Sequence, residues 1–236
     1  MTAIWKRELQ SYFYTPVGYV FMGVFLTISS VLFYLQIMQQ RSSDLMTFIG
    51  QMSYLWMLLS PVLTMRLLAE ERQKRTDQLL LTSPVSLPGI VLGKYAAAVT
   101  VMLLTVALTL AFVVIVALYG AVYPGELVTG YLGFILQGCA FIALDLFLSS
   151  CASSPVIAAV LAFGANFTLW MMDMLVEVIY VDWINAILDF LSLYSRNEPF
   201  LMGQLSFAGI GYDISFTVLF LVLTIHRLDM RRYQGG

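Results

Sequence analysis

Long runs of apolar residues, each closed by charged residues or by a turn, dominate the sequence. Six of these runs are long enough to cross a bilayer, because a membrane-spanning helix needs about 20 predominantly apolar residues. The predicted spans cover residues 17–38, 45–65, 95–119, 127–150, 156–172 and 207–226. Tyr119 and Gly120 close the third run, and Pro155 separates the fourth from the fifth. The pattern predicts an all-α integral membrane protein with a single transmembrane domain over residues 1–236.

The composition supports this prediction and excludes several classes of function. Of the 236 residues, 60% are apolar and 11% are charged, whereas soluble domains are about 45–50% apolar and about 25% charged. Six spans use about half of the chain, which leaves little room for a nucleotide-hydrolysing domain. Gly89, Gly93 and Lys94 imitate a phosphate-binding loop, but the spacing is short and no Ser or Thr follows the lysine. Cys139 and Cys151 form neither a disulfide framework nor a metal-ligand spacing.

The basic residues orient the spans, because loops rich in Lys and Arg stay on the cytoplasmic side. With both termini inside, ten of the 12 basic residues are cytoplasmic and two, Arg41 and Arg196, face outward. The ten are Lys6, Arg7, Arg66, Arg72, Lys74, Arg75, Lys94, Arg227, Arg231 and Arg232. This distribution predicts a multi-pass protein with six spans and cytoplasmic termini.

Two segments outside the spans have a mixed character. In residues 1–15, apolar residues such as Ile4 and Trp5 recur at helical spacing opposite charged residues, and Pro16 ends the run. We expect an amphipathic helix in the cytoplasmic interface, the alternative being a disordered tail. Residues 173–206 are too hydrophobic for a free loop and too charged for a span. Short re-entrant helices that dip into the outer leaflet fit this segment, because exposed irregular backbone is not tolerated in lipid.

The loop of residues 66–94 is the most distinctive segment, with eight of the 26 charged residues (12 basic and 14 acidic). A second short helix is predicted over residues 76–81, Pro84 ends it, and Ser86 is a candidate cap for the helix that re-enters the membrane. Three consecutive leucines beside mixed charges indicate a docking surface. An ordinary cytoplasmic loop would need only scattered Lys and Arg.

Three stretches carry a resemblance to a known family. They are the loop residues Ala69-Glu70-Glu71-Arg72, Thr76, Leu79 to Pro84 and Ile90 to Lys94, the N-terminal Trp5-Lys6-Arg7-Glu8 ahead of Pro16, and the segment from Leu191 to Gly203. Together they resemble the type-two ABC exporter permeases, and most closely the gliding-motility branch. The pair Thr76 and Asp77 departs from the pattern, since many relatives have a glycine before the threonine and a glutamate after it.

The resemblance implies an N-terminal elbow helix, a dimer of permeases and a coupling helix in the 66–94 loop that sits in a groove of a separate ABC ATPase. Two ATPase copies would bind ATP and Mg²⁺, so the chain itself is expected to hold no cofactor and no metal, and to have no catalytic residue. Residues 149–154 map onto a second, smaller cytoplasmic contact. The implied coupling residues are Glu70, Glu71, Arg72, Thr76, Asp77, Leu79, Leu80, Leu81, Pro84 and Ser86.

Two acidic residues and a row of alanines stand out within the spans. Asp145 and Asp213 are candidates for an ion or substrate role, because ionisable residues in spans are functional candidates by default. Hydrogen bonding to the elbow helix or to a neighbouring helix is the alternative for Asp145. Ala158, Ala162 and Ala165 allow close helix packing, and the resemblance places them at the dimer seam.

The sequence therefore predicts the permease subunit of an ABC exporter in the bacterial cytoplasmic membrane. Its partners would be two ATPase subunits, a second identical or paralogous permease and membrane lipid, but no nucleic acid. The alternative is a non-transporting ABC subunit that transmits force to, or anchors, a gliding-type surface assembly. An intramembrane enzyme is disfavoured because the lone histidine, His226, has no catalytic partner nearby in the sequence. A secondary transporter is disfavoured by the absence of internal repeats and midplane charges.

Overall fold

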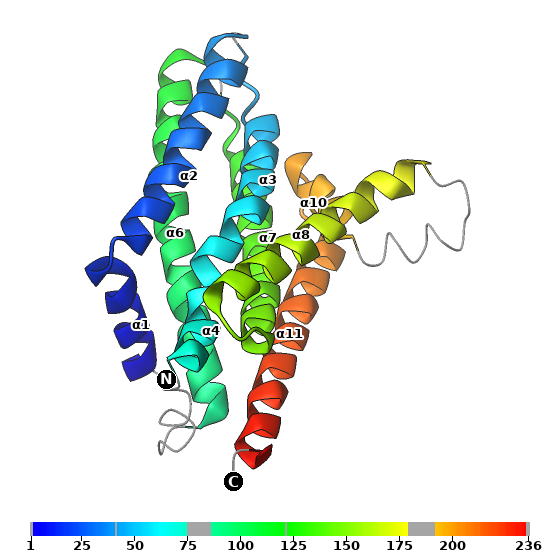
Figure 1. The fold of residues 1–236 in the computed structure, drawn as a ribbon. Coiled ribbons are helices and arrows are strands. Elements are labelled where there is room, and N and C mark those ends of the chain that lie inside the picture. The colour runs from blue at the N-terminus through cyan, green and yellow to red at the C-terminus, as the bar shows by residue number, and fades with distance from the viewer. Residues whose placement is uncertain (1, 41, 75–85, 121, 179–191, 235–236) are drawn as a thin grey trace.

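The computed structural model describes residues 2–40, 42–74, 86–120, 122–178 and 192–234, and every regular element within these ranges is helical (Figure 1). The elements are α1 (Thr2–Tyr14), α2 (Val17–Phe33), the π-helical turn η1 (Tyr34–Met38), α3 (Leu45–Thr64), α4 (Arg66–Gln73), α6 (Leu87–Tyr119), α7 (Pro124–Cys151), α8 (Pro155–Val178), α10 (Leu193–Leu201) and α11 (Phe207–Gln234). The all-α fold class is confirmed.

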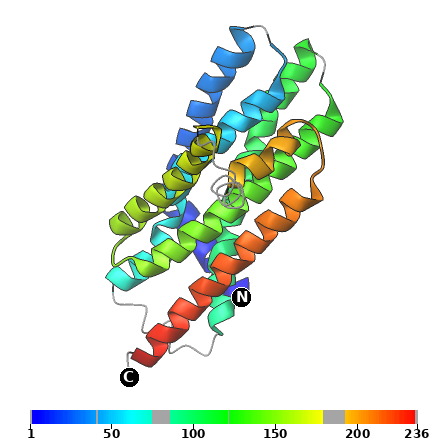
Figure 2. The ribbon, with the colours of Figure 1, turned by 90° about the vertical axis from the view of Figure 1, so that its right-hand side faces the viewer.

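Within the described residues, six helical stretches are long and apolar enough to span a membrane, which agrees with the predicted number. The central pair is α3 and α7, where 67% of the apolar window is buried, against 33% or less in the other four stretches. α2 and α6 lie on one side of this pair, α8 crosses it obliquely, and α11 runs along α7 (Figures 1 and 2). Only the central helices are therefore enclosed by protein, and the outer ones keep apolar faces for lipid or for a partner.

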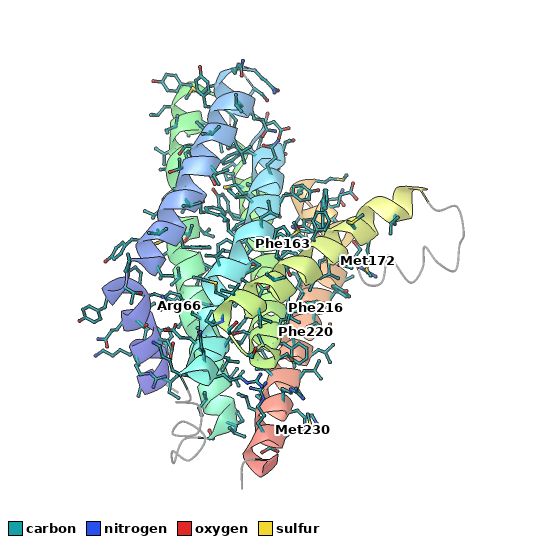
Figure 3. The ribbon with its side chains drawn as sticks, viewed as in Figure 1. Arg66, Phe163, Met172, Phe216, Phe220 and Met230 are labelled. Atoms are coloured by element: carbon teal, nitrogen blue, oxygen red, sulfur yellow. The ribbon has the colours of Figure 1, made fainter. Side chains whose placement is uncertain are left out.

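Aromatic side chains fill the centre of the bundle. The ring of Trp56 on α3 is 1% exposed and meets Phe21 and Phe25 of α2 edge to face, at centroid distances of 5.5 and 5.7 Å. On the other side of α7, Phe216 and Phe220 of α11 lie 4.7 Å apart between ring centroids (Figure 3). Such edge-to-face and tilted pairs add stabilisation beyond the apolar area that they bury.

Several helix boundaries differ from the predicted spans. α11, for example, continues to Gln234, beyond the predicted end at residue 226. α6 begins at Leu87 rather than at residue 95. Pro88 lies in its first turn, where backbone N–H groups have no partner within the helix, so proline costs no helical hydrogen bond there. Lys94, the predicted boundary of this span, lies inside the helix and is 1% exposed. α8 continues to Val178, beyond the predicted end at residue 172. The end of α6 at Tyr119, followed by Gly120, agrees with the prediction.

The outer segment contributes one described helix, α10, which packs against α3, α7, α8 and α11. Ser192 caps it by accepting a hydrogen bond from the backbone N–H of Ser195 at 2.9 Å. Phe200 is fully buried, and Gly133 of α7 makes room for it: a Cβ at Gly133 would lie 2.7 Å from the Phe200 Cβ and 2.3 Å from Asn197 Oδ1. A helix therefore does occur within 173–206, while residues 179–191 lie outside the described ranges.

Candidate coupling site

α4 is a short helix that follows α3 after a turn at Met65 and lies at the same end of the bundle as both termini (Figure 1). It contacts α7 and α8 through one side. Its other side reaches α1 and α6 through charged side chains. We call the residues that hold α4 in place the α4 collar, comprising Arg7, Glu8, Glu71, Arg72, Lys94 and Ser149.

Four charged residues of the α4 collar form one cluster between α1, α4 and α6. Lys94 Nζ donates to Glu8 Oε1 at 3.1 Å and to Glu71 Oε1 at 2.9 Å. Arg7 Nη2 donates to the same two oxygens, at 2.7 and 3.0 Å. The two cations balance the two carboxylates, so the cluster is neutral and the buried ammonium has counter-charges in place.

The four side chains of this cluster differ in how far they are exposed to solvent. The Lys94 side chain is 1% exposed, those of Glu8 and Glu71 are 14% and 19% exposed, and that of Arg7 is 56% exposed. Hydrogen bonding to Glu8 raises the pKa of Arg7, so this guanidinium stays charged. The Lys94 side chain is thus shielded from water, and Glu8 and Glu71 contact its ammonium in place of solvent.

The other side of α4 is bonded to the end of α7. Arg72 Nη1 donates to the carbonyl oxygens of Cys151 and Ala152, at 3.2 and 2.8 Å. These carbonyls belong to the last turn of α7, where a cation also complements the helix dipole. Ser149 Oγ accepts from the N–H groups of Leu68 and Ala69, at 3.3 and 3.2 Å.

Three further contacts attach α1 and α11 to the same end. Tyr12 OH donates to the Leu63 carbonyl at 2.7 Å, next to the turn between α3 and α4, and burial raises the pKa of Tyr12. Trp5 Nε1 donates to Thr100 Oγ1 of α6 at 3.0 Å. Arg231 Nη2 donates to the Ser150 carbonyl. Helices α1, α3, α4, α6, α7 and α11 thus meet around the α4 collar.

The predicted coupling residues fall into four groups. Glu71 and Arg72 are in the α4 collar, whereas Glu70 forms pairs on α4 itself, with Arg66 at 2.6 Å and Lys74 at 2.7 Å. Ser86 occupies the N-cap position of α6, but its side chain makes no capping bond. The remaining six, Thr76, Asp77, Leu79, Leu80, Leu81 and Pro84, lie outside the described residues.

A comparison with models of protein families shows to which family the chain belongs. The profile described as ABC-2 family transporter protein matches residues 4–226. The chain belongs to the ABC-2 transporter family. It is therefore a permease, the transmembrane component of an ABC transporter, and such components typically have no catalytic activity of their own. A search of curated proteins finds no match.

The alanines of this ABC-2 permease are placed differently from the prediction. Ala158 and Ala162 are each 1% exposed, and Ala158 packs with Ala69 and Ala152 inside the chain. Since their surface is already covered, these two side chains have almost none left for a dimer seam, which corrects the expectation; Ala165 is half-buried. The outward face of α8 instead shows Val160, Phe163, Phe167 and Met171, which are 39–66% exposed.

Both intramembrane aspartates are buried. Asp145 is 1% exposed and accepts a hydrogen bond from Ser60 Oγ of the neighbouring helix α3 at 2.7 Å. Asp213 of α11 is 2% exposed, and its Oδ1 has no hydrogen-bond partner among the described residues. Neither side chain belongs to the α4 collar.

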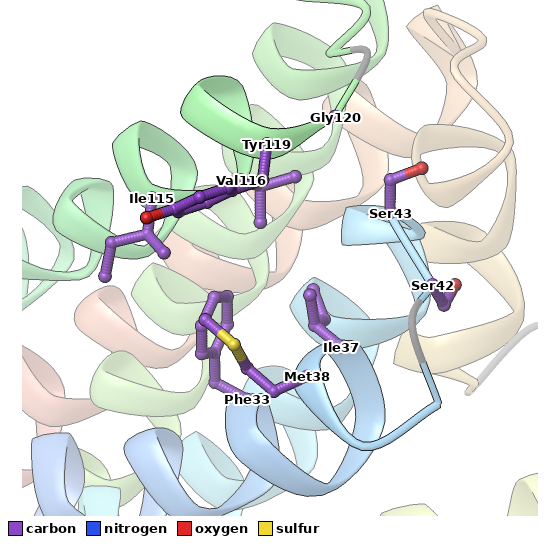
Figure 4. A pocket seen from close by; sticks show the side chains of 9 residues that line it. All are labelled: Phe33, Ile37, Met38, Ser42, Ser43, Ile115, Val116, Tyr119 and Gly120. Atoms are coloured by element: carbon purple, nitrogen blue, oxygen red, sulfur yellow. The ribbon is translucent and has the colours of Figure 1, made fainter.

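A groove at the opposite end of the bundle is separate from the α4 collar. It encloses about 460 Å³ between the η1 end of α2 and the end of α6. Phe33, Ile37, Ile115 and Val116 form apolar walls, and the hydroxyls of Ser42 and Ser43 lie at its rim (Figure 4). Its described lining residues include no acidic or basic group, so the groove suits hydrocarbon rather than a charged ligand.

Lys94 is the important residue whose role the sequence reasoning missed. The sequence analysis gives it no structural role beyond a cytoplasmic charge at the end of the 66–94 loop, and its pairing with Glu8 joins residues 86 positions apart in the chain. The available signal is its place near the start of a long apolar run, since a cation there needs a buried counter-charge. Glu8 is visible within the N-terminal Trp5-Lys6-Arg7-Glu8 motif, but no pattern in the sequence links it to Lys94.

Proposed function

We propose that this permease is the membrane subunit of an ABC exporter, and that α4 with the loop after it receives the motion of a separate ATPase. The observation that carries the proposal is the double attachment of α4. Glu71 ties it to α6 and α1 through Lys94, and Arg72 ties it to the end of α7. A displacement of α4 would therefore act on both halves of the bundle at once.

In this proposal the end with α4 and both termini is cytoplasmic, in a bacterial inner membrane, as the distribution of Lys and Arg predicts. Two ATPase subunits bind ATP and Mg²⁺ and each grips one 66–94 loop. ATP binding shifts the population from inward-open to outward-open states, and the rigid spans carry the motion outward. Membership of the ABC-2 family implies an ABC ATPase partner.

A second permease, identical or paralogous, would pack against α8. Its outward face presents Phe163 and Phe167 as a stacked pair with ring centroids 6.1 Å apart. Between them Gly164 leaves open space: apart from its chain neighbours and its own helix backbone, no atom of the described residues lies within 4 Å of the place that a Cβ would take. A flat aromatic surface beside a glycine permits close helix approach in lipid.

The ATPase contact is tested by purifying the chain from its native membranes in mild detergent and measuring the stoichiometry of co-purifying proteins. We expect an ATPase at one copy per permease. It should be lost when residues 76–84 are scrambled, because this change removes the predicted docking segment. The α4 collar lies outside the scrambled residues and stays intact. The double substitution Tyr119→Ser and Tyr123→Ser, at exposed positions of the opposite end, is the control. An unchanged ATPase stoichiometry in the scrambled variant would contradict the proposal.

Coupling is tested without knowing the cargo, by spin labels at position 119 that report the distance between two permeases. ATP with vanadate should change this distance in the intact complex. In Arg72→Gln the ATPase should remain bound and active while the distance change is reduced, because α4 has lost its bonds to α7. A full distance change in that variant would show that the attachment of α4 to α7 carries no motion.

A further inference from the structure

A buried polar cluster joins α3, α7 and α8 within the membrane-spanning part of the bundle. Its members are Ser60, Thr64, Asp145 and Asn166, each 0–1% exposed. Ser60 Oγ donates to Asp145 Oδ2 at 2.7 Å, and the Asn166 and Thr64 side chains also lie beside the Asp145 carboxyl. No part of the proposed coupling mechanism uses this cluster.

Pro61 determines how Asn166 is oriented. Proline has no N–H, so the Met57 carbonyl one turn earlier in α3 receives no helical hydrogen bond from it. Asn166 Nδ2 donates to this carbonyl at 3.2 Å and to Ser60 Oγ at 3.3 Å. Because a carbonyl can only accept, the amide nitrogen must face α3, and Asn166 Oδ1 is left as an acceptor.

The cluster then lacks one donor. Among the described residues, neither Asp145 Oδ1 nor Asn166 Oδ1 has a hydrogen-bond partner. In the described part of the chain, the side chains that act on the Asp145 carboxyl are Ser60, Asn166 and Thr64, and all three are neutral. Three cations of the neighbouring α4 and α11 are engaged elsewhere: Arg66 with Glu70, Arg72 with the end of α7, and Arg231 with the Ser150 carbonyl.

We propose that Asp145 is a proton-binding site, whose carboxylic acid donates from Oδ1 to Asn166 Oδ1 and so completes the hydrogen bonding between α7, α8 and α3. One proton satisfies both unpartnered oxygens. A bare carboxylate in this place would leave two buried acceptors without a donor and an uncompensated charge in a low-dielectric interior. Loss of the proton weakens the attachment of α8, so release of the proton and movement of α8 away from α3 are linked.

Infrared difference spectroscopy on the full chain in lipid nanodiscs, with the ATPase that co-purifies, tests this directly. At neutral pH we expect a C=O band of a protonated carboxyl that shifts in heavy water, is absent in Asp145→Asn and declines when the pH is raised. Asp213→Asn is the matched control, since it removes the other buried intramembrane carboxyl and should leave this band in place. Identical wild-type and Asp145→Asn spectra in this region would overturn the proposal.

Thermal unfolding of the same samples gives an independent test. An asparagine can donate to Asn166 and accept from Ser60 as the neutral acid does, so Asp145→Asn should melt within ~3 °C of wild type and should not lose stability at alkaline pH. Asp145→Leu, which leaves Ser60 and Asn166 without their partner, should melt lower. If Asp145→Asn is as unstable as Asp145→Leu, the negative charge is required and the proposal is wrong.

Discussion

Substitution of Lys94 by methionine is the sharpest test of the α4 collar, because it removes the buried cation and preserves most of the side-chain volume. At an effective dielectric constant of ~20, charges at 2.9 and 3.1 Å attract by about 6 and about 5 kcal/mol. Desolvation of the three groups offsets most of this sum. Removing one partner from a buried pair costs about 3–5 kcal/mol. Because Arg7 still contacts both carboxylates, we expect the lower end, about 3 kcal/mol.

For a chain of this size, about 3 kcal/mol corresponds to a fall in melting temperature of roughly 6–12 °C. The assay is thermal unfolding of the purified protein in nanodiscs, with Lys6→Met as the control, since Lys6 is an exposed cation on α1. The double variant Lys94→Met with Glu71→Gln should be less destabilised than the sum of the two single variants, because one carboxylate then remains for Arg7. Melting of Lys94→Met at the temperature of Lys6→Met, or strict additivity in the double variant, would refute the reasoning.

Three further substitutions test other parts of the structure. Arg72→Gln should cost about 1–2 kcal/mol, because a charged donor to Cys151 and Ala152 is lost, and amide hydrogen exchange near residues 149–152 should rise. Gly133→Ala should cost about 1–3 kcal/mol in thermal unfolding, since its Cβ would lie 2.3 Å from Asn197 Oδ1, whereas Gly23→Ala, in open space on α2, should be neutral or stabilising. Asp44→Ala should cost about 1 kcal/mol through loss of the bonds from Met46 and Thr47, with Asp44→Asn close to wild type. The hydrogen bond from Thr47 lowers the pKa of Asp44. The stabilisation from Asp44 should therefore be present above its unfolded pKa of about 3.9 and be lost as the pH falls through its folded pKa. Acid unfolding of the wild type, compared with that of Asp44→Asn, measures this loss.

The candidate site could be predicted only in part. The charges and leucines of the 66–94 loop mark the segment, and α4 lies within it. The sequence pattern gives Glu70, Glu71 and Arg72 one shared role, but in the structure Glu70 bonds to its own helix while Glu71 and Arg72 bond to opposite sides. Direction around a short helix follows from 100° per residue, but which neighbour stands in each direction depends on packing.

The alanines of α8 also show that a sequence pattern does not identify the neighbour against which a helix packs. Small residues at helical spacing predict a close approach of helices, and Ala158 does make one. Its partners, Ala69 of α4 and Ala152 at the end of α7, lie within the same chain rather than on a second copy. The spacing of residues along one helix contains no information on whether its neighbour belongs to the same chain.

Local patterns in the sequence were sufficient to place the six apolar helices and several of their ends. Insertion into lipid depends on the length and apolarity of a local segment, and Gly120, Pro124 and Asp44 act on the residues next to them. Only the tertiary structure shows which polar groups contact one another, namely Lys94 with Glu8 and Glu71, and Asp145 with Ser60 and Asn166. These contacts join residues far apart in the chain and depend on the rotation of each helix about its axis, which no local pattern specifies.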